Sequence, residues 1–187
     1  KTRVATAITQ MTLAKSTGRV IVLANRKQLV HQFAAALRAA GLDVGIAQGE
    51  NTAGLHHRVV VCSIDTIHAR SYTFEDVALF IIDEAHAVAG SEKYRTLLFR
   101  YNRVPVIGLS ATPFARGLGK PYPELAGRPL FEELIVGATV QQLVELVRIA
   151  FGKSGYPFDT PEILQGAVNI GVGYCPLYRL FIIGFGA

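Results

Sequence analysis

Apolar runs alternate with amphipathic segments along the first 112 residues of the chain. Short runs rich in β-branched residues predict buried strands, and segments with apolar positions every three or four residues predict helices. The predicted strands span 19–24, 44–47, 58–64, 77–82 and 104–109, and the predicted helices span 4–13, 27–40, 66–70 and 91–100. Apolar strands that alternate with helices indicate an α/β fold, in which helices cover both faces of a parallel sheet.

The pattern loosens after about residue 113. Residues 114–129 are rich in Gly and Pro and predict a loop, whereas residues 139–150 predict an amphipathic helix. Residues 151–187 hold seven Gly and only four charged residues, a composition that argues against a well-packed core of their own. We therefore expect one domain over residues 1–145, followed by a tail over residues 146–187 whose structure the pattern does not define.

The composition fits one domain of ordinary size, because half of the 187 residues are hydrophobic. The formal net charge of +5 permits a nucleic-acid partner, although a basic surface without any partner is about as common. The two cysteines, Cys62 and Cys175, make neither a disulfide framework nor a metal-ligand spacing, so a reducing cytoplasm is the expected location. No apolar stretch is long enough to span a bilayer. Because the first residue is Lys, we expect the chain to be part of a longer protein.

The strongest chemical feature is an acidic pair at the end of the predicted strand 77–82. Asp83 and Glu84 follow the run VALFII and precede Ala85 and His86. Carboxylates at the end of a buried strand are costly unless a partner offsets their charge. Mg²⁺ beside Asp83 would do so, because this ion takes one or two carboxylates together with phosphate oxygens. Glu84 would then be free to act as a general base toward water. The alternative is a polar strand end before a helix start, where acidic residues are favourable.

Hydroxyl and cationic residues stand at two other points that suit phosphate chemistry. Lys1 and Thr2 precede a predicted helix, and in a phosphate-binding loop a Lys reaches the β- and γ-phosphates while the hydroxyl binds Mg²⁺. Ser110, Ala111 and Thr112 follow the last predicted strand, where hydroxyls can bond to the acidic residues. Each segment alone has an ordinary explanation, because a Lys-Thr pair is not specific and Ser, Thr and Pro are common in turns.

A third group of residues follows the predicted strands 19–24 and 58–64. Arg26 lies at the start of a helix, where backbone amides and a guanidinium group suit a phosphodiester. Ser63 and Thr66 carry small hydroxyls, which contact nucleic-acid backbones without reading sequence. The alternatives are a solvated charge at Arg26 and a helix N-cap at Ser63.

Taken together, the order and spacing of these residues resemble the DEAD/DEAH-box helicases and translocases of superfamily 2. Residues 1–2 resemble the end of the Walker A motif, and residues 83–86 resemble the Walker B box. Residues 110–112 resemble the motif that couples the ATP state to strand movement. Residues 24–32 and 63–66 resemble two nucleic-acid-contacting motifs.

The resemblance covers roughly residues 1–145 and implies a RecA-like P-loop NTPase fold. Within the superfamily, the segments GIAQGEN, VVVCSIDTIHAR and HAVAGSEKYRTLL are most similar to the bacterial and phage branch related to type III restriction motor (res) subunits. That branch acts on DNA, so the resemblance implies DNA rather than RNA as the partner. Gln48 and Gly49 lie where the family often has a contact to nucleic acid that contains Gly.

The resemblance also implies a site for ATP and Mg²⁺. Lys1 would bind the phosphates, Thr2 and Asp83 would hold Mg²⁺, and Glu84 would activate water. His86 would link the nucleotide to the coupling residues, which are Ser110, Ala111 and Thr112. The residues along the phosphodiester backbone would be Arg26, Gly49, Ser63 and Thr66.

Several sequence elements of the family's ATP-driven motor do not appear in this sequence. These are the glycines before Lys1, the strand before them, and a second RecA-like domain with its arginine finger, which contributes about 10³–10⁵ in rate. We therefore expect the isolated chain to hydrolyse ATP slowly and to unwind nothing, in contrast to its parent. Two other functions stay open: a nucleic-acid-binding module without ATPase activity, and an ATPase switch that acts on protein.

Overall fold

The computed structural model describes residues 1–111, 117–138 and 181–185. The predicted helix over 139–150 lies outside these residues, as do Thr112 and most of the tail. Four α-helices are present in the described part: α1 (Thr2–Lys15), α2 (Lys27–Ala39), α3 (Ile64–Ala69) and α4 (Glu92–Arg100). The strands of the main sheet are β1 (Arg19–Ala24), β2 (Val44–Ala47), β3 (Val59–Ser63), β4 (Val77–Asp83), β5 (Val106–Ser110), β8 (Glu133–Ala138) and β9 (Phe181–Phe185).

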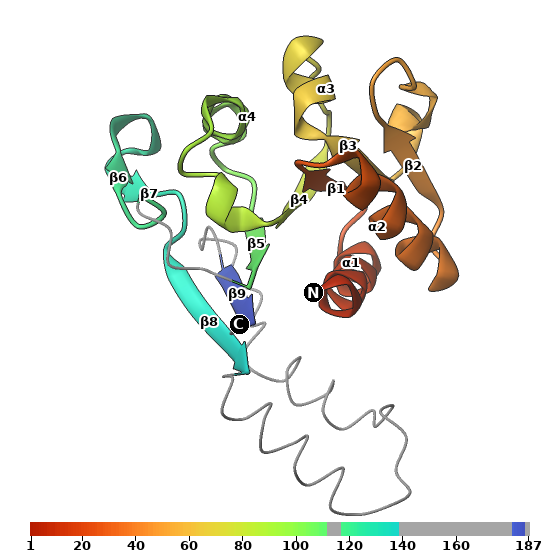
Figure 1. Ribbon diagram of the computed structural model, residues 1–187, viewed down its shortest axis with the longest axis horizontal. Helices are drawn as coiled ribbons and strands as arrows, with labels where there is room; N and C mark the ends of the chain where they lie inside the picture. Colours follow the sequence, from red (N-terminus) through yellow and green to blue (C-terminus); the bar gives the residue numbers. More distant parts are fainter. Residues whose placement is uncertain (112–116, 139–180, 186–187) are drawn as a thin grey trace, which may run out of the picture.

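The main sheet is parallel throughout and has the strand order β2-β3-β1-β4-β5-β9-β8 (Figure 1). This order differs from the chain order, so helices and loops cross from one strand to the next, as a parallel sheet requires. The observed architecture confirms the predicted α/β fold. The first five strands and their helices lie within two residues of the predicted ends.

Alternate side chains of the central strands serve two separate cores. In β1, Val20 and Val22 belong to the core on one face of the sheet, whereas Ile21 and Leu23 belong to the core on the other. Helices α1 and α2 contribute to the first core, and α3 and α4 contribute to the second. The strands read as unbroken apolar runs because both of their faces are covered.

The segment predicted as a loop over 114–129 contains a small hairpin in its described part. Strand β6 (Pro121–Tyr122) pairs antiparallel with β7 (Arg128–Pro129), and the short 3-10 helix η3 (Pro123–Leu125) joins them. Two further 3-10 helices, η1 (Ala53–His56) and η2 (Ala85–Ala87), were not predicted either. Strand β5 begins at Val106, after Pro105, because proline has no N–H to donate to a sheet.

Strand β9 comes last in sequence among the described strands, but it does not lie at an edge of the sheet. Strand β9 lies between β5 and β8 and pairs in parallel with both of them. The sequence pattern predicted neither β8 nor β9. No helix within the described residues is long and apolar enough to cross a membrane.

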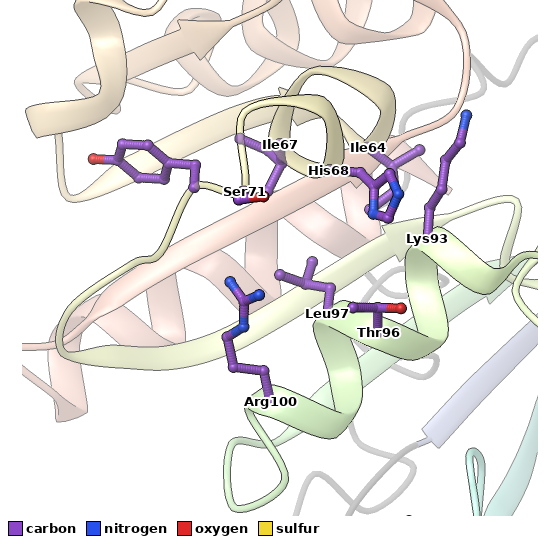
Figure 2. A pocket seen from close by; sticks show the side chains of 9 residues that line it. Ile64, Ile67, His68, Ser71, Lys93, Thr96, Leu97 and Arg100 are labelled. Atoms are coloured by element: carbon purple, nitrogen blue, oxygen red, sulfur yellow. The ribbon is translucent and has the colours of Figure 1, made fainter.

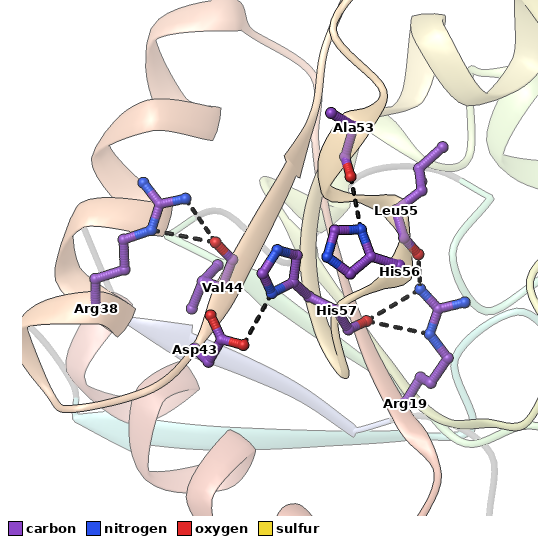
Figure 3. Close-up of polar contacts among 8 residues, drawn as sticks. All are labelled: Arg19, Arg38, Asp43, Val44, Ala53, Leu55, His56 and His57. Atoms are coloured by element: carbon purple, nitrogen blue, oxygen red, sulfur yellow. Dashed lines mark hydrogen bonds and ion pairs between the residues drawn. The ribbon is translucent and has the colours of Figure 1, made fainter.

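A network of polar contacts fixes η1 against the strands beside it (Figure 3). The Arg19 guanidinium donates hydrogen bonds to the carbonyls of Leu55 and His57, the latter at 3.0 and 3.2 Å. The His57 Nδ1 atom lies 2.9 Å from an Asp43 carboxylate oxygen, and the His56 Nδ1 atom lies 2.7 Å from the Ala53 carbonyl oxygen. These two histidines therefore have structural partners, and the described residues contain no cluster of three or more His, Cys, Asp or Glu that could hold a metal.

Candidate nucleotide and nucleic-acid sites

The predicted site residues gather at the edge of the sheet where its parallel strands end. Ligands bind at this edge in open α/β sheets, because the loops that leave it carry exposed polar groups. The residues predicted to bind nucleotide follow β4 and β5 or begin α1. Those predicted to bind nucleic acid follow β2, β3 and β1, which are neighbours in the other half of the sheet. The edge is thus divided into two adjoining parts.

Lys1 and Glu84 form an ion pair across 83 positions of sequence, between the Lys1 Nζ atom and a Glu84 carboxylate oxygen. Both side chains stay about one quarter exposed, at 25% and 27%, so a ligand can still reach them. Helix α1 packs against β1 and β4, and this packing brings its first residue to the acidic end of β4. The structure therefore joins two segments that the sequence analysis linked only by resemblance.

Asp83 is the last residue of β4 and is only 5% exposed. Burial raises the pKa of its carboxyl group, and the neighbouring charge of Glu84 raises it further. The Lys1 charge and the Glu84 backbone N–H act in the opposite direction. Because the net direction is upward, the carboxylate has less positive charge around it than its burial demands. A cation beside Asp83 would correct this deficit.

Glu84 adopts a left-handed backbone conformation, with φ 54° and ψ 51°. A side chain other than Gly, Asn or Asp rarely takes this conformation, which costs on the order of 1–3 kcal/mol. The conformation turns the chain sharply between β4 and η2, and the Ala87 N–H donates a hydrogen bond to the Glu84 carbonyl at 2.9 Å. Backbone strain of this kind is concentrated at functional sites.

His86 connects the acidic pair to the neighbouring strand. Its Nδ1 atom lies 3.0 Å from the Ser110 hydroxyl oxygen and 3.3 Å from a Glu84 carboxylate oxygen. Ser110 is fully buried and follows Leu109, which is the sheet partner of Asp83. The structure thus brings His86 and Ser110 together, as expected for a link between the two strand ends. Ala111 is partly exposed beside them, and Thr112 lies outside the described residues.

The donor set at this edge fits a magnesium ion that is bound together with phosphates. Asp83 offers one buried carboxylate, and Thr2 offers a hydroxyl in the first turn of α1. Mg²⁺ keeps several waters and takes one or two carboxylates plus phosphate oxygens, so it does not need a cage made of protein alone. The helix start and the Lys1 ammonium group both favour a bound anion.

In the other half of the edge, a hydrogen bond joins two of the residues predicted to contact nucleic acid. The Gly49 N–H donates to the Thr66 hydroxyl at 2.7 Å, and Gly49 has a positive φ of 59°. Ser63 at the end of β3 is the sheet partner of Ala24 at the end of β1. Ala24 precedes Arg26 by two positions. Arg26 is exposed at the start of α2, whereas Ser63 and Thr66 are buried. Hence Arg26 and the Gly49 backbone are the more accessible members of this group.

Three buried polar groups were not among the site residues predicted from the sequence, although Gln48 was named beside Gly49. Among the residues that the structure describes, no hydrogen-bond partner reaches the buried side-chain oxygens of Asn25 and Gln48, which follow β1 and β2, or the buried Tyr94 hydroxyl. Asn25 and Gln48 belong to segments that the resemblance covers, so their position was a usable signal. Tyr94 gave no signal, because an aromatic residue at helical spacing predicts only a core position.

A hollow of about 140 Å³ lies between α3 and α4, the two helices that cover one face of the sheet (Figure 2). Apolar side chains, among them Ile64, Ile67 and Leu97, form part of its lining, and His68, Lys93 and Arg100 also line it. The two helices also meet in a shared core, to which Ile64, Ile67 and Leu97 belong. At the surface, the Lys93 Nζ atom lies 2.6 Å from an Asp65 carboxylate oxygen.

Comparisons with known proteins agree with this geometry. Residues 1–115 match the family described as type III restriction enzyme, res subunit. Among solved structures, the chain is similar to the crystal structure of the Pyrococcus furiosus Hef helicase domain, with 32% sequence identity and a TM-score of 0.54. That similarity covers 68% of this chain and 29% of the other, so this chain spans less than a third of the solved chain. No curated protein matches the sequence.

Proposed function

Because the chain belongs to the family of type III restriction enzyme res subunits, we propose that it couples ATP hydrolysis to movement on nucleic acid. It is a RecA-like helicase domain of superfamily 2, similar in fold to the Hef helicase domain. We assign this domain to residues 1–145, and we include β9 because it pairs within the same sheet. DNA is the favoured partner, since the family takes its name from restriction enzymes.

The observation that carries the proposal is the contact of Lys1 with Glu84 beside the buried Asp83. In the proposed reaction, the Lys1 ammonium group binds the β- and γ-phosphates of ATP. Mg²⁺, held by Asp83 and Thr2, neutralises charge on the phosphate oxygens when bound. Glu84 exchanges its contact with Lys1 for a water molecule and accepts a proton from it during attack on the terminal phosphate.

The second half of the edge holds the nucleic-acid backbone. The Arg26 guanidinium and the backbone amides that begin α2 bind phosphates, while Gly49 contributes a further amide near the end of β2. Ser63 and Thr66 are buried beneath this surface, and the Thr66 hydroxyl accepts a hydrogen bond from the Gly49 N–H. Such contacts read the backbone and not the bases, so binding is independent of base sequence.

We assign His86, Ser110, Ala111 and Thr112 as the coupling residues of the proposed motor, and the His86 and Ser110 contacts lie within the nucleotide half of the edge. The His86 contacts to Glu84 and Ser110 span the gap between β4 and β5. A change at the terminal phosphate can therefore reach Ser110 at the end of β5 through Glu84 and His86. A second RecA-like domain of the parent would complete the motor and supply the arginine that accelerates hydrolysis. On its own, the chain hydrolyses ATP slowly.

Titration of the chain with a fluorescent ATP analogue and Mg²⁺ tests the nucleotide site. We expect Mg²⁺-dependent binding that Lys1→Ala weakens at least about tenfold, corresponding to roughly 1.4 kcal/mol. Glu84→Gln keeps the binding, because the general base acts on water and not on the phosphates. Lys93→Ala is the matched control, since Lys93 lies outside the nucleotide site. Equal binding by the Lys1→Ala variant and the unaltered chain would refute the site.

The two alternative functions predict different results. A nucleic-acid-binding module without ATPase activity binds oligonucleotides and not the ATP analogue. An ATPase switch that acts on protein binds the analogue but shows no binding to single-stranded DNA. The proposed function requires both, and its DNA affinity must fall as salt rises, because binding through phosphates releases counterions.

A further inference from the structure

Helices α3 and α4 present matching rows of side chains to the hollow that lies between them (Figure 2). The α4 row has intervals of three, one and three positions and consists of Lys93, Thr96, Leu97 and Arg100. The row on α3 and the turn after it has the same intervals and consists of Ile64, Ile67, His68 and Ser71. Residues at this spacing share one face of a helix, so each row extends along two helical turns. The hollow is therefore a short groove, about 10 Å long.

The floor of the hollow is apolar, and its rim is polar and exposed. Ile64, Ile67 and Leu97 are at most 5% exposed and form the floor. The exposed lining residues form the rim and are His68, Ser71, Lys93, Thr96 and Arg100. An engineered apolar cavity of about 150 Å³ holds one benzene molecule. The hollow, at about 140 Å³, therefore has room for one aromatic side chain and not for a ligand as large as a nucleotide.

The rim carries basic side chains at both ends of the α4 row. Lys93 and Arg100 lie at opposite ends of this row, and none of the described lining residues has a carboxylate (Figure 2). Lys93 pairs with Asp65, which lies outside the lining, whereas Arg100 forms no ion pair with a described residue. A ligand complementary to this surface therefore carries negative charge on both sides of an apolar group.

A peptide fits the hollow better than a nucleic-acid strand does. Proteins hold single strands with successive aromatic faces on which the bases stack. The floor here is aliphatic, and of the lining rings Tyr72 packs edge-on against Phe74 while His68 stands alone on the rim, so the described lining offers no row of stacking surfaces. An extended peptide advances about 3.3 Å per residue. Carboxylates one or two positions from a central anchor therefore reach both ends of the groove.

We propose that the hollow is a docking site for an acidic segment of a partner protein, in which one Phe side chain stands between carboxylates. The Phe ring occupies the apolar floor, and its burial supplies most of the binding free energy. One flanking carboxylate pairs with Arg100, and another shares Lys93 with Asp65. The lining residues are separate from those proposed to bind ATP and nucleic acid. The site thus adds a protein partner to the proposed function and attaches it without covering either ligand.

Fluorescence polarisation with a labelled heptapeptide, EEDFDEE, tests the site on the 187-residue chain. We expect saturable binding with a dissociation constant below about 1 mM, as for other small and transient interfaces. Replacing the central Phe of the peptide with Ala should weaken binding at least about tenfold, because the apolar contact is lost. The peptide KKKFKKK keeps the Phe, reverses the charge and should not bind.

Two substitutions at exposed rim positions separate the apolar and the charged contributions. Thr96→Phe fills the hollow from the α4 side and should weaken binding of EEDFDEE at least about tenfold. Arg100→Glu reverses one rim charge and should weaken it about fivefold, the upper value for an exposed ion pair. Lys120→Glu is the matched control, because it reverses a charge at an exposed position outside the lining. If Thr96→Phe does not fold, Arg100→Glu and the Ala peptide decide the question.

Competition with oligothymidylate distinguishes a peptide site from a nucleic-acid site. At about 0.15 M salt, where charges more than about 8 Å apart are screened, the peptide should stay bound when oligothymidylate is in excess. Displacement of the peptide would assign the hollow to nucleic acid and overturn the proposal.

Three other results would also overturn it: no binding of EEDFDEE up to about 1 mM, equal binding of the Ala peptide, or equal losses in Arg100→Glu and Lys120→Glu. The last result would indicate attraction to net charge alone. Because no peptide measurement requires ATP binding, the docking site and the proposed nucleotide site can fail separately.

Discussion

At the scale of single residues, the proposed nucleotide site depends on a charge imbalance. Burial raises the pKa of Asp83 although Lys1 opposes the shift. The neighbouring Glu84 is turned by a left-handed backbone conformation and is paired with Lys1. One carboxylate is therefore buried and fixed, whereas the other is accessible and can exchange its partner. This difference in environment suits Asp83 to its proposed role as a metal ligand and Glu84 to its proposed role as a general base.

Arg19 is a residue whose role is structural. Its guanidinium donates to the Leu55 and His57 carbonyls (Figure 3). It also lies 5.7 Å from the centre of the Phe74 ring. We predict that Arg19→Met lowers the free energy of unfolding by about 1–3 kcal/mol, because two partly buried carbonyls lose their donor. Urea denaturation followed by circular dichroism measures the change. Arg103→Met, at an exposed position, should stay within about 0.5 kcal/mol of the unaltered chain. Equal effects of the two substitutions would contradict this role.

Cys62 is a buried thiol in the centre of β3. It is fully buried, and burial raises its pKa far above the ordinary value. Because only the thiolate reacts, we predict that Cys62 does not react with a disulfide reagent until the chain unfolds. The test uses a Cys175→Ser background, with Ser71→Cys at an exposed position as the reactive control. Rapid labelling of Cys62 in the folded chain would contradict the prediction.

The same pKa shift fixes the direction of a pH effect. The thiol has a higher pKa in the folded chain than in the unfolded chain, so the unfolded state loses its proton first as pH rises. The contribution to stability is complete below about pH 8.5 and declines above it, by up to roughly 1.4 kcal/mol per pH unit. We predict that Cys62→Ala has a shallower fall in unfolding free energy between pH 8.5 and 10. Parallel slopes for the two proteins would rule this out.

At the scale of helices and strands, two glycines allow η1 to lie against β2. A Cβ atom on Gly45 would lie 1.9 Å from the Gly54 carbonyl oxygen, and one on Gly54 would lie 2.3 Å from the Ile46 nitrogen. These contacts involve backbone atoms, so the clash cannot be relieved by turning a side chain. The distance between β2 and η1 thus depends on the absence of both side chains.

A pair of alanine substitutions tests this close approach. We predict that Gly45→Ala lowers the free energy of unfolding by about 1–3 kcal/mol or more, because the backbone must shift to admit a methyl group. Gly90→Ala is the control, since a Cβ atom there has no neighbour within 4 Å. Thermal unfolding of the two variants measures the difference. The close approach would be disproved by a Gly45→Ala chain as stable as the control.

The sequence predicted the first five strands well because each combines one unbroken apolar run with a polar strand end. It predicted the positions of Asp83, Glu84 and Ser110 for the same reason. The Gly49–Thr66 hydrogen bond and the burial of the Tyr94 hydroxyl were not predictable, because they depend on how α3 and α4 pack. Strand β9 was missed since its pairing with β5 joins residues far apart in the chain, and its Gly-rich surroundings indicated no strand.

At the scale of the whole molecule, one sheet holds both proposed binding regions. Its order places β2, β3 and β1 on one side and β4, β5, β9 and β8 on the other. The two proposed regions therefore adjoin where β1 and β4 pair directly, so they are parts of one continuous sheet.

Strand β9 gives a test of the sheet as a unit. Removal of residues 181–187 takes away the strand between β5 and β8 and leaves two unpaired strand edges. We predict a melting temperature at least about 5 °C lower and concentration-dependent self-association, because exposed edges pair with other chains. Light scattering and thermal unfolding measure these effects. A shortened chain that stays monomeric and equally stable would show that β9 is dispensable.

The inner position of β9 also has a consequence for biosynthesis. Ser110 of β5 and Gly184 of β9 are partners in the finished sheet, yet 74 positions separate them. At about 5–20 residues per second, the ribosome needs roughly 4–15 s to add those residues. After residue 138 has been added, the nascent chain contains β5 and β8 but not the strand that joins them. This half of the sheet therefore becomes complete only after β9 has been synthesised, and its pairing depends on contacts between residues far apart in the chain.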